Sequence, residues 1–131
     1  MKPIHANLFY HDGRGPILKM VHYNGSGACL RAIDFINPDE SEKDVKHLVF
    51  IKSQVFMFTP EEVENYASSV VDWSKTGKAA MVNLGHSSWL SSFAPLHLRE
   101  CSHFRAMFYD EFVDVICEDI EVRNGCAPPT P

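Results

Sequence analysis

Residues 17–36 read ILKMVHYNGSGACLRAIDFI, and this stretch decides the sheet topology. Two β-prone runs, Ile17–Tyr23 and Ala28–Ile36, flank the polar segment Asn24-Gly25-Ser26-Gly27. An Asn-Gly pair tolerates the positive φ angles that a tight turn between strands requires, so the stretch predicts a β-hairpin. Strands joined by a short turn are antiparallel neighbours, because a parallel pair needs a long crossover.

Further strands are predicted on both sides of this hairpin. A short strand is expected near Ile4–Tyr10, and a long run rich in Val, Phe and Ile follows at His47–Phe58, with an irregularity at Ser53-Gln54. His103–Tyr109 and Phe112–Val122 form a second hairpin, because alternate residues of each run are apolar and would share one face.

One helix is predicted over residues 60–75. Thr59-Pro60-Glu61-Glu62 combines a capping hydroxyl, a proline suited to the first helical position and a carboxylate three residues after the threonine. Thr76-Gly77 would end the helix. An apolar stripe at helical spacing follows the cap: Val63, Tyr66, Ala67, Val70 and Trp73. The expected fold is therefore α+β, an antiparallel, hairpin-rich sheet with this helix packed on one face. Residues 79–84 fit a strand or a helix equally.

The chain length and composition indicate a single domain over residues 1–123 and a Pro-rich, flexible tail over residues 124–131. No apolar run approaches the roughly 20 residues needed to span a bilayer, and the N-terminus lacks a secretory pattern. A soluble cytoplasmic protein is expected. The cysteines lie far apart in the sequence, which favours reduced thiols: Cys29, Cys101, Cys117 and Cys126.

Charge is unevenly distributed along the chain. Residues 1–60 carry seven bases and six acids, whereas residues 61–121 carry eleven acids and four bases. No basic stripe is available to neutralise phosphates, so nucleic-acid binding is not expected. The second hairpin is strongly acidic, with Asp110, Glu111, Asp114, Glu118, Asp119 and Glu121. These acids could meet a basic partner, hold a cation or perform acid–base chemistry, although strand-edge charge that prevents aggregation is the simpler reading.

A second candidate interaction surface is the segment Trp89-Leu90-Ser91-Ser92-Phe93. Trp89 and Phe93 could serve as apolar anchors, because Trp is frequent among interface hot spots, or could fold down over a small core. With Asp110, Glu111, Asp114 and Glu118, they make up the predicted interaction site.

A possible metal site involves His97, Cys101 and His103. If residues 96–101 are helical, His97 and Cys101 lie one turn apart, and His103 could approach from the next strand. Imidazole and thiolate are good zinc ligands. Paired ligand motifs, which usually mark structural zinc sites, are missing from the sequence, so no cofactor is predicted and zinc stays an option.

Gly85-His86-Ser87-Ser88-Trp89 begins like the nucleophile elbow GxSxG, but Trp89 replaces the last glycine. A serine nucleophile also needs a base and an orienting carboxylate, which this sequence does not place. A turn in which the serines bond the backbone is the alternative interpretation.

Two functional hypotheses follow. The favoured one is a small intracellular, non-enzymatic domain of the adaptor or inhibitor type, which binds another protein or forms a homodimer through a strand edge. The alternative is a small enzyme or ligand-binding domain, with or without a metal ion, that uses His86, His97, Cys101 and His103.

Overall fold

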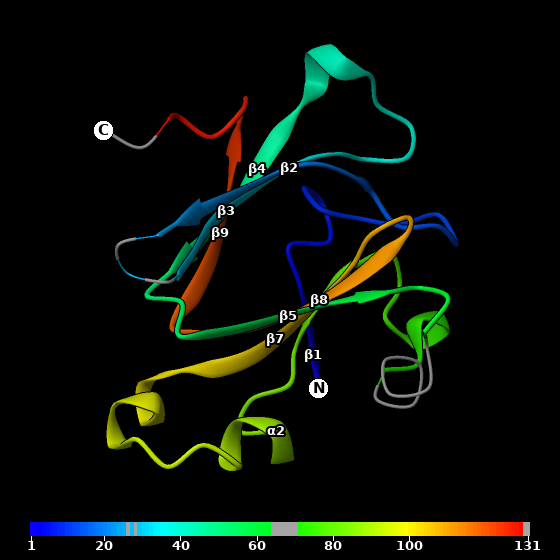
Figure 1. The fold of residues 1–131 in the computed structure, drawn as a ribbon. Helices are drawn as coiled ribbons and strands as arrows, with labels where there is room; N and C mark the ends of the chain where they lie inside the picture. The colour runs from blue at the N-terminus through cyan, green and yellow to red at the C-terminus, as the bar shows by residue number, and fades with distance from the viewer. Residues whose placement is uncertain (26, 28, 64–70, 130–131) are drawn as a thin grey trace.

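The hairpin of residues 17–36 is present in the computed structural model, which describes residues 1–25, 27, 29–63 and 71–129 (Figure 1). β2 (Ile17–Asn24) pairs antiparallel with β3 (Cys29–Ile36). The second predicted hairpin is also confirmed, because β7 (Ser102–Met107) pairs antiparallel with β8 (Glu111–Cys117).

The strands form two antiparallel sheets. The four-stranded sheet has the order β2-β3-β4-β9 and adds β4 (Lys46–Ile51) and β9 (Asp119–Asn124) to the first hairpin. The five-stranded sheet has the order β1-β6-β7-β8-β5 and adds β1 (Lys2–Ile4), β6 (Met81–Asn83) and β5 (Val55–Pro60) to the second. β2 and β5 are therefore edge strands.

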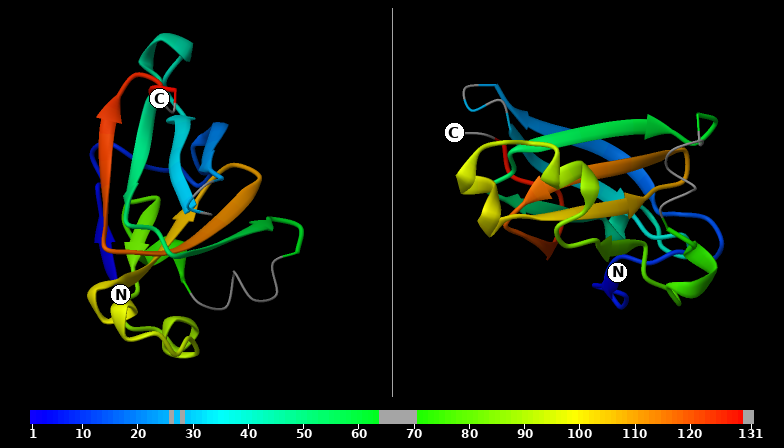
Figure 2. Two further views of the ribbon diagram at one scale, coloured as in Figure 1. Left: turned by 60° about the vertical axis from the view of Figure 1, so that its left-hand side comes forward. Right: turned by 90° about the horizontal axis from the view of Figure 1, so that it is seen from below.

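The hydrophobic core lies between the two sheets, which pack face to face (Figure 2). Successive side chains of a strand point to opposite faces, so every second residue enters the core. Val113 and Val115 of β8 enter it from one sheet, and Ile33 and Phe35 of β3 enter it from the other. Phe9 fills the space between them, with its ring edge-on to Phe35 at a centroid distance of 4.8 Å.

The prediction of an α+β fold with one main helix is wrong. The described residues contain only short helices: α2 (Ser88–Ser91) and the 3-10 helices Glu42–Asp44, Trp73–Lys75 and Leu96–Glu100. Pro60, expected to begin the long helix, is the last residue of β5 and lies opposite Glu111 of β8. Proline is tolerated there because an edge strand leaves one row of backbone groups unpaired. Residues 64–70, the centre of the expected helix, lie outside the described residues.

Two long runs expected as single strands are each divided in two. The run 47–58 turns at Lys52, whose φ of 53° lies in the left-handed region, and Ser53 stabilises the turn by donating a hydrogen bond to the carbonyl of Leu30 (2.8 Å). The run 112–122 breaks after Cys117, where the chain passes from β8 into β9 of the other sheet. The apolar stretch 79–84, left open between strand and helix, contains strand β6.

Two segments complete the fold. Residues 84–101 carry α2 and the 3-10 helix Leu96–Glu100, and they project at the end of the molecule where the N-terminus lies (Figure 2). The segment expected as a flexible tail begins in β9, and the Ala127 amide donates a hydrogen bond to buried Asp34 (2.8 Å). Within the described ranges, no helix is long and apolar enough to cross a membrane.

Candidate functional site: an acidic mouth and a buried polar network

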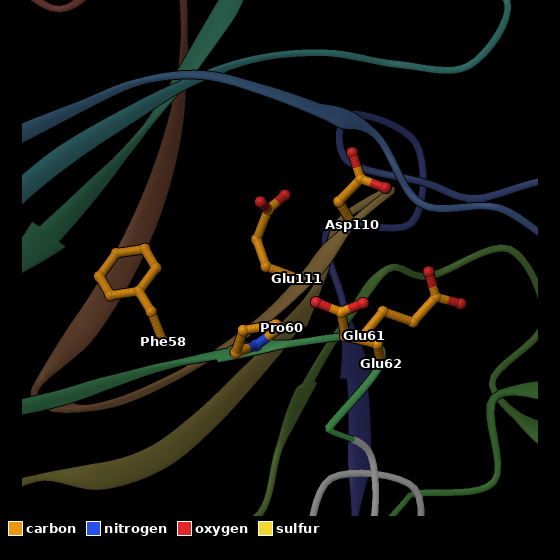
Figure 3. Close-up of a pocket in the computed structure, with 6 residues that line it drawn as sticks. All are labelled: Phe58, Pro60, Glu61, Glu62, Asp110 and Glu111. Atoms are coloured by element: carbon orange, nitrogen blue, oxygen red, sulfur yellow. The ribbon is translucent and has the colours of Figure 1, made fainter.

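An acidic pocket of about 560 Å³ opens where the end of β5 meets the start of β8 (Figure 3). We call it the acidic mouth, and its lining residues are Phe58, Pro60, Glu61, Glu62, Asp110 and Glu111. Four of these six residues carry carboxylates. A backbone hydrogen bond from the Glu61 amide to the Asp110 carbonyl (2.8 Å) ties the two acidic segments together.

The apolar floor of the acidic mouth is part of the core-facing side of the five-stranded sheet. Phe58 lies opposite Val113, and Pro60 lies opposite Glu111. Directly opposed residues of antiparallel strands share one face, and Val113 belongs to the core. Phe58, Pro60 and Glu111 therefore occupy the rim of the interior, and Figure 3 shows the Phe58 and Glu111 side chains rising from the same side of the sheet.

The acids of the mouth repel one another. Burial and, secondarily, the neighbouring Asp110 raise the pKa of Glu111. Among the described residues, no cationic side chain forms an ion pair with the four acids of the mouth; the described ion pairs all lie elsewhere. Arg14 lines an adjoining pocket together with Glu61 and Asp110, but its guanidinium donates a hydrogen bond to the Tyr109 hydroxyl (3.0 Å). A cation that entered the mouth would relieve this repulsion.

A buried polar network lies on the opposite, outward face of the same sheet and consists of Ser87, His103, Asp114 and Arg105. Arg105 and Asp114 face each other across β7 and β8, and two hydrogen bonds join the guanidinium to the carboxylate (2.8 and 3.0 Å). His103 Nε2 lies 2.6 Å from Asp114 Oδ1, and His103 Nδ1 lies 2.7 Å from Ser87 Oγ. The side chains of His103, Arg105 and Asp114 are at most 1% exposed.

The segment Trp89–Phe93 packs against this network. The Trp89 ring lies 4.8 Å from the imidazole of His103 and meets Phe93 edge-on at 5.8 Å. Trp89 is therefore half-buried and Phe93 stays partly exposed. Of the predicted interaction acids, Asp110 and Glu111 line the mouth. Asp114 is buried, whereas Glu118 is exposed and its carboxylate lies 3.5 Å from the Lys52 ammonium.

The three predicted metal ligands have separate environments. His97 is exposed and contacts Gln54, while Cys101 is buried in an apolar cluster, which raises the pKa of its thiol. Both ring nitrogens of His103 are occupied by Ser87 and Asp114. Within the described parts of the chain, no three His, Cys, Asp or Glu residues are grouped to hold a metal ion, so the zinc hypothesis gains no support. His86 is exposed beside a small pocket near Leu90.

No family model, curated protein or solved structure matches this chain. Its function must therefore be argued from the geometry of the acidic mouth and the polar network.

Sequence reasoning missed two features of these sites. Glu61 and Glu62 were assigned to a helix, so their approach to Asp110 was not foreseen. Arg105 was not singled out, although the register of the second hairpin would have placed it opposite Asp114. An arginine facing an aspartate between apolar neighbours on two central strands is a usable signal of a buried ion pair.

Proposed function

We propose that this chain is a binding domain that receives a basic, partly apolar segment of a partner protein at the acidic mouth. The observation that supports this function is the convergence of four carboxylates on an open pocket with an apolar floor and no ion-paired cation among the described residues. The proposal agrees with the adaptor or inhibitor role that the sequence favours.

The chemistry of the mouth suits a lysine or arginine side chain. Such side chains place their methylene stem along apolar surface and keep the charged head among polar groups. Phe58 and Pro60 offer the apolar surface, and Glu62 and Asp110 offer exposed carboxylates at its rim. The excess of acids over residues 61–121 would also attract a basic partner over a distance, an effect that salt weakens.

An aromatic row continues from the mouth along the edges of the two sheets. Phe58 meets Phe56 at a ring distance of 6.1 Å, and Phe56 meets Tyr23 of β2 at 5.8 Å. Tyr23 is 52% exposed, and aromatic side chains contribute much of the binding energy at protein interfaces. A partner segment could therefore contact this row with its apolar residues while its basic residue occupies the mouth.

The free edge of β2 supports self-association as a second candidate. β2 is eight residues long, and Ile17, Met20 and Val21 are exposed on it. A long, apolar edge strand can pair with another strand. Sedimentation velocity over a range of concentrations tests this, and a monomer at all concentrations would contradict the homodimer hypothesis.

Binding at the mouth is tested by calorimetric titration with a short peptide of alternating lysine and leucine. The double variant Glu62→Gln/Asp110→Asn removes two exposed charges, each worth up to about 1 kcal/mol, so affinity should fall roughly 5- to 30-fold. The control variant Glu100→Gln/Glu121→Gln removes two exposed charges outside the mouth and should bind almost normally. An equal loss in both variants would mean that the peptide responds only to net charge, and the proposal would fail.

A further inference from the structure

The hydrogen bonds of the polar network determine which atom of His103 faces Ser87. Both oxygens of Asp114 accept hydrogen bonds from Arg105, as an ionised carboxylate does. A carboxylate cannot donate, so His103 Nε2, 2.6 Å from Asp114 Oδ1, must be the protonated nitrogen. In the neutral imidazole the lone pair then resides on Nδ1, which lies 2.7 Å from Ser87 Oγ. The Ser87 hydroxyl therefore donates to a nitrogen able to take its proton.

Ser87 is held in place by its hydrogen bonds and is not fully buried. It caps the N-terminus of α2, where its Oγ accepts a hydrogen bond from the Leu90 amide (3.2 Å). A hydroxyl oxygen has two lone pairs, so one remains available. Ser87 is only half-buried, whereas His103 is 1% exposed and is covered by the Trp89 ring. Ser87 thus lies between the protein surface and the buried base.

We propose that Ser87 is a nucleophile that His103 activates, and that it is acylated by small carboxylic esters. Nucleophile, base and orienting carboxylate stand in the order and at the distances that acyl transfer requires. The site is separate from the acidic mouth, since it lies on the outward face of the sheet.

The proposed reaction has two steps. Ser87 Oγ attacks the ester carbonyl carbon and forms a C–O bond, and its proton passes to His103 Nδ1; the C–O bond to the alcohol breaks, and the alcohol leaves with that proton. A water molecule then attacks the acyl-Ser87 carbonyl and gives one proton to Nδ1, from which it returns to Ser87 Oγ as the carboxylic acid is released. Asp114 keeps the imidazole in the required tautomer throughout.

The surroundings of Ser87 suggest the class of ester. His86 and Leu90, its neighbours in the same turn, line a pocket of about 250 Å³ whose other walls include Phe93 and Leu98. Ser87 does not itself line this pocket, whose walls also include the polar residues Ser91 and Arg99, and a volume of this size suits a short acyl group.

The choice of ester decides which step limits turnover. An ester with a good leaving group depends little on proton transfer to His103 in the first step. Attack by water on the acyl-enzyme, in contrast, requires His103 to accept the proton. We therefore expect the acyl group to accumulate on Ser87, with a burst of released alcohol followed by slow turnover.

The test uses a fluorophosphonate and p-nitrophenyl acetate on the full chain, with the modified residue located by peptide mass spectrometry. Ser88 is the matched control, since it is the adjacent serine, is exposed and lacks the bond to His103. General-base assistance is worth about 100-fold or more, so Ser87 should be modified at least that much faster than Ser88.

Two variants complete the experiment. Ser88→Ala should react like the wild type, and Ser87→Asn, which keeps a capping side chain, should lose both the label and the burst. Modification of Ser88 at the rate of Ser87, or an unlabelled wild type, would overturn the proposal. Because mapping of the wild type decides the question alone, the result does not depend on whether a variant folds.

Discussion

Replacing Asp114 with asparagine should destabilise the protein more than any other isosteric change at an acidic residue in the described part of the chain. The Asp114 side chain is 1% exposed, and it is hydrogen-bonded to Arg105, which is fully buried, and to His103. Asparagine keeps the shape but removes the charge, so the guanidinium of Arg105 stays buried without its carboxylate. Breaking a buried ion pair in this way costs about 3–5 kcal/mol.

The assay is urea unfolding followed by circular dichroism. With an m value of roughly 1–3 kcal/mol/M, a loss of this size lowers the unfolding midpoint by about 1 M or more. Glu118→Gln is the control, because it removes an exposed carboxylate 3.5 Å from Lys52 and should cost less than about 1 kcal/mol. If Asp114→Asn were as mild as the control, the pair with Arg105 would not be an ionised, solvent-free contact, and the reasoning would be refuted.

Three further predictions concern other parts of the fold. Gly15→Ala should lower the free energy of unfolding in urea by roughly 1–3 kcal/mol, because the new Cβ would lie 2.5 Å from the backbone of Phe108. Gly25→Ala is the control, since its Cβ would meet nothing within 4 Å. Equal stabilities of the two variants would contradict the close packing at Gly15. Burial, and secondarily the adjacent aspartate, raise the pKa of Glu111, so the folded chain binds the carboxyl proton more tightly than the unfolded chain does. The free energy of unfolding therefore falls as pH rises through the folded-state pKa of Glu111. Glu111→Gln should remove that loss above pH 4.5 in unfolding curves recorded against pH, and an unchanged profile would count against the shift. A thiol reagent should modify exposed Cys126 before Cys117, whose burial raises its thiol pKa, and peptide mapping that found the reverse order would disprove this.

The parts of the fold that the sequence predicted correctly are those specified by local signals. The Asn24-Gly25 turn and its two flanking runs are sufficient to predict β2 and β3, and alternating apolar residues predict β7 and β8. Both hairpins join strands that are close in sequence, so their pairing depends little on the rest of the chain.

The expected helix shows where local signals were insufficient. Thr59-Pro60-Glu61-Glu62 has every feature of a helix cap, yet residues 55–60 pair along their length with β8. Pairing with β8 packs Phe56 partly against the core and Val55 partly against the apolar cluster on the outward face, and these contacts outweigh a local preference. The predicted irregularity at Ser53-Gln54 marked one of the two places where the chain changes sheets, beside Lys52, whereas the break after Cys117 was not predicted.

The candidate sites were predicted in fragments. Asp110 and Glu111 were identified as acidic residues of a turn, but the mouth also needs Glu61 and Glu62, which reach it only through the pairing of β5 with β8. His103 was assigned to a metal site because nearby sequence offered ligands. Its partners are instead 16 residues before it and 11 residues after it, a convergence that depends on tertiary structure.

The alternation of side chains along β8 separates the proposed binding site from the buried polar network. Glu111 and Asp114 are three residues apart, so they point to opposite faces of the sheet. Glu111 lies at the rim of the core-facing side, where water and a partner can reach it, and Asp114 lies on the outward face under the segment that carries α2. A hairpin that looks uniformly acidic in sequence therefore places carboxylates on both faces of the sheet. Substitutions at Glu111 should alter ligand binding with little effect on the polar network, and substitutions at Asp114 should do the opposite.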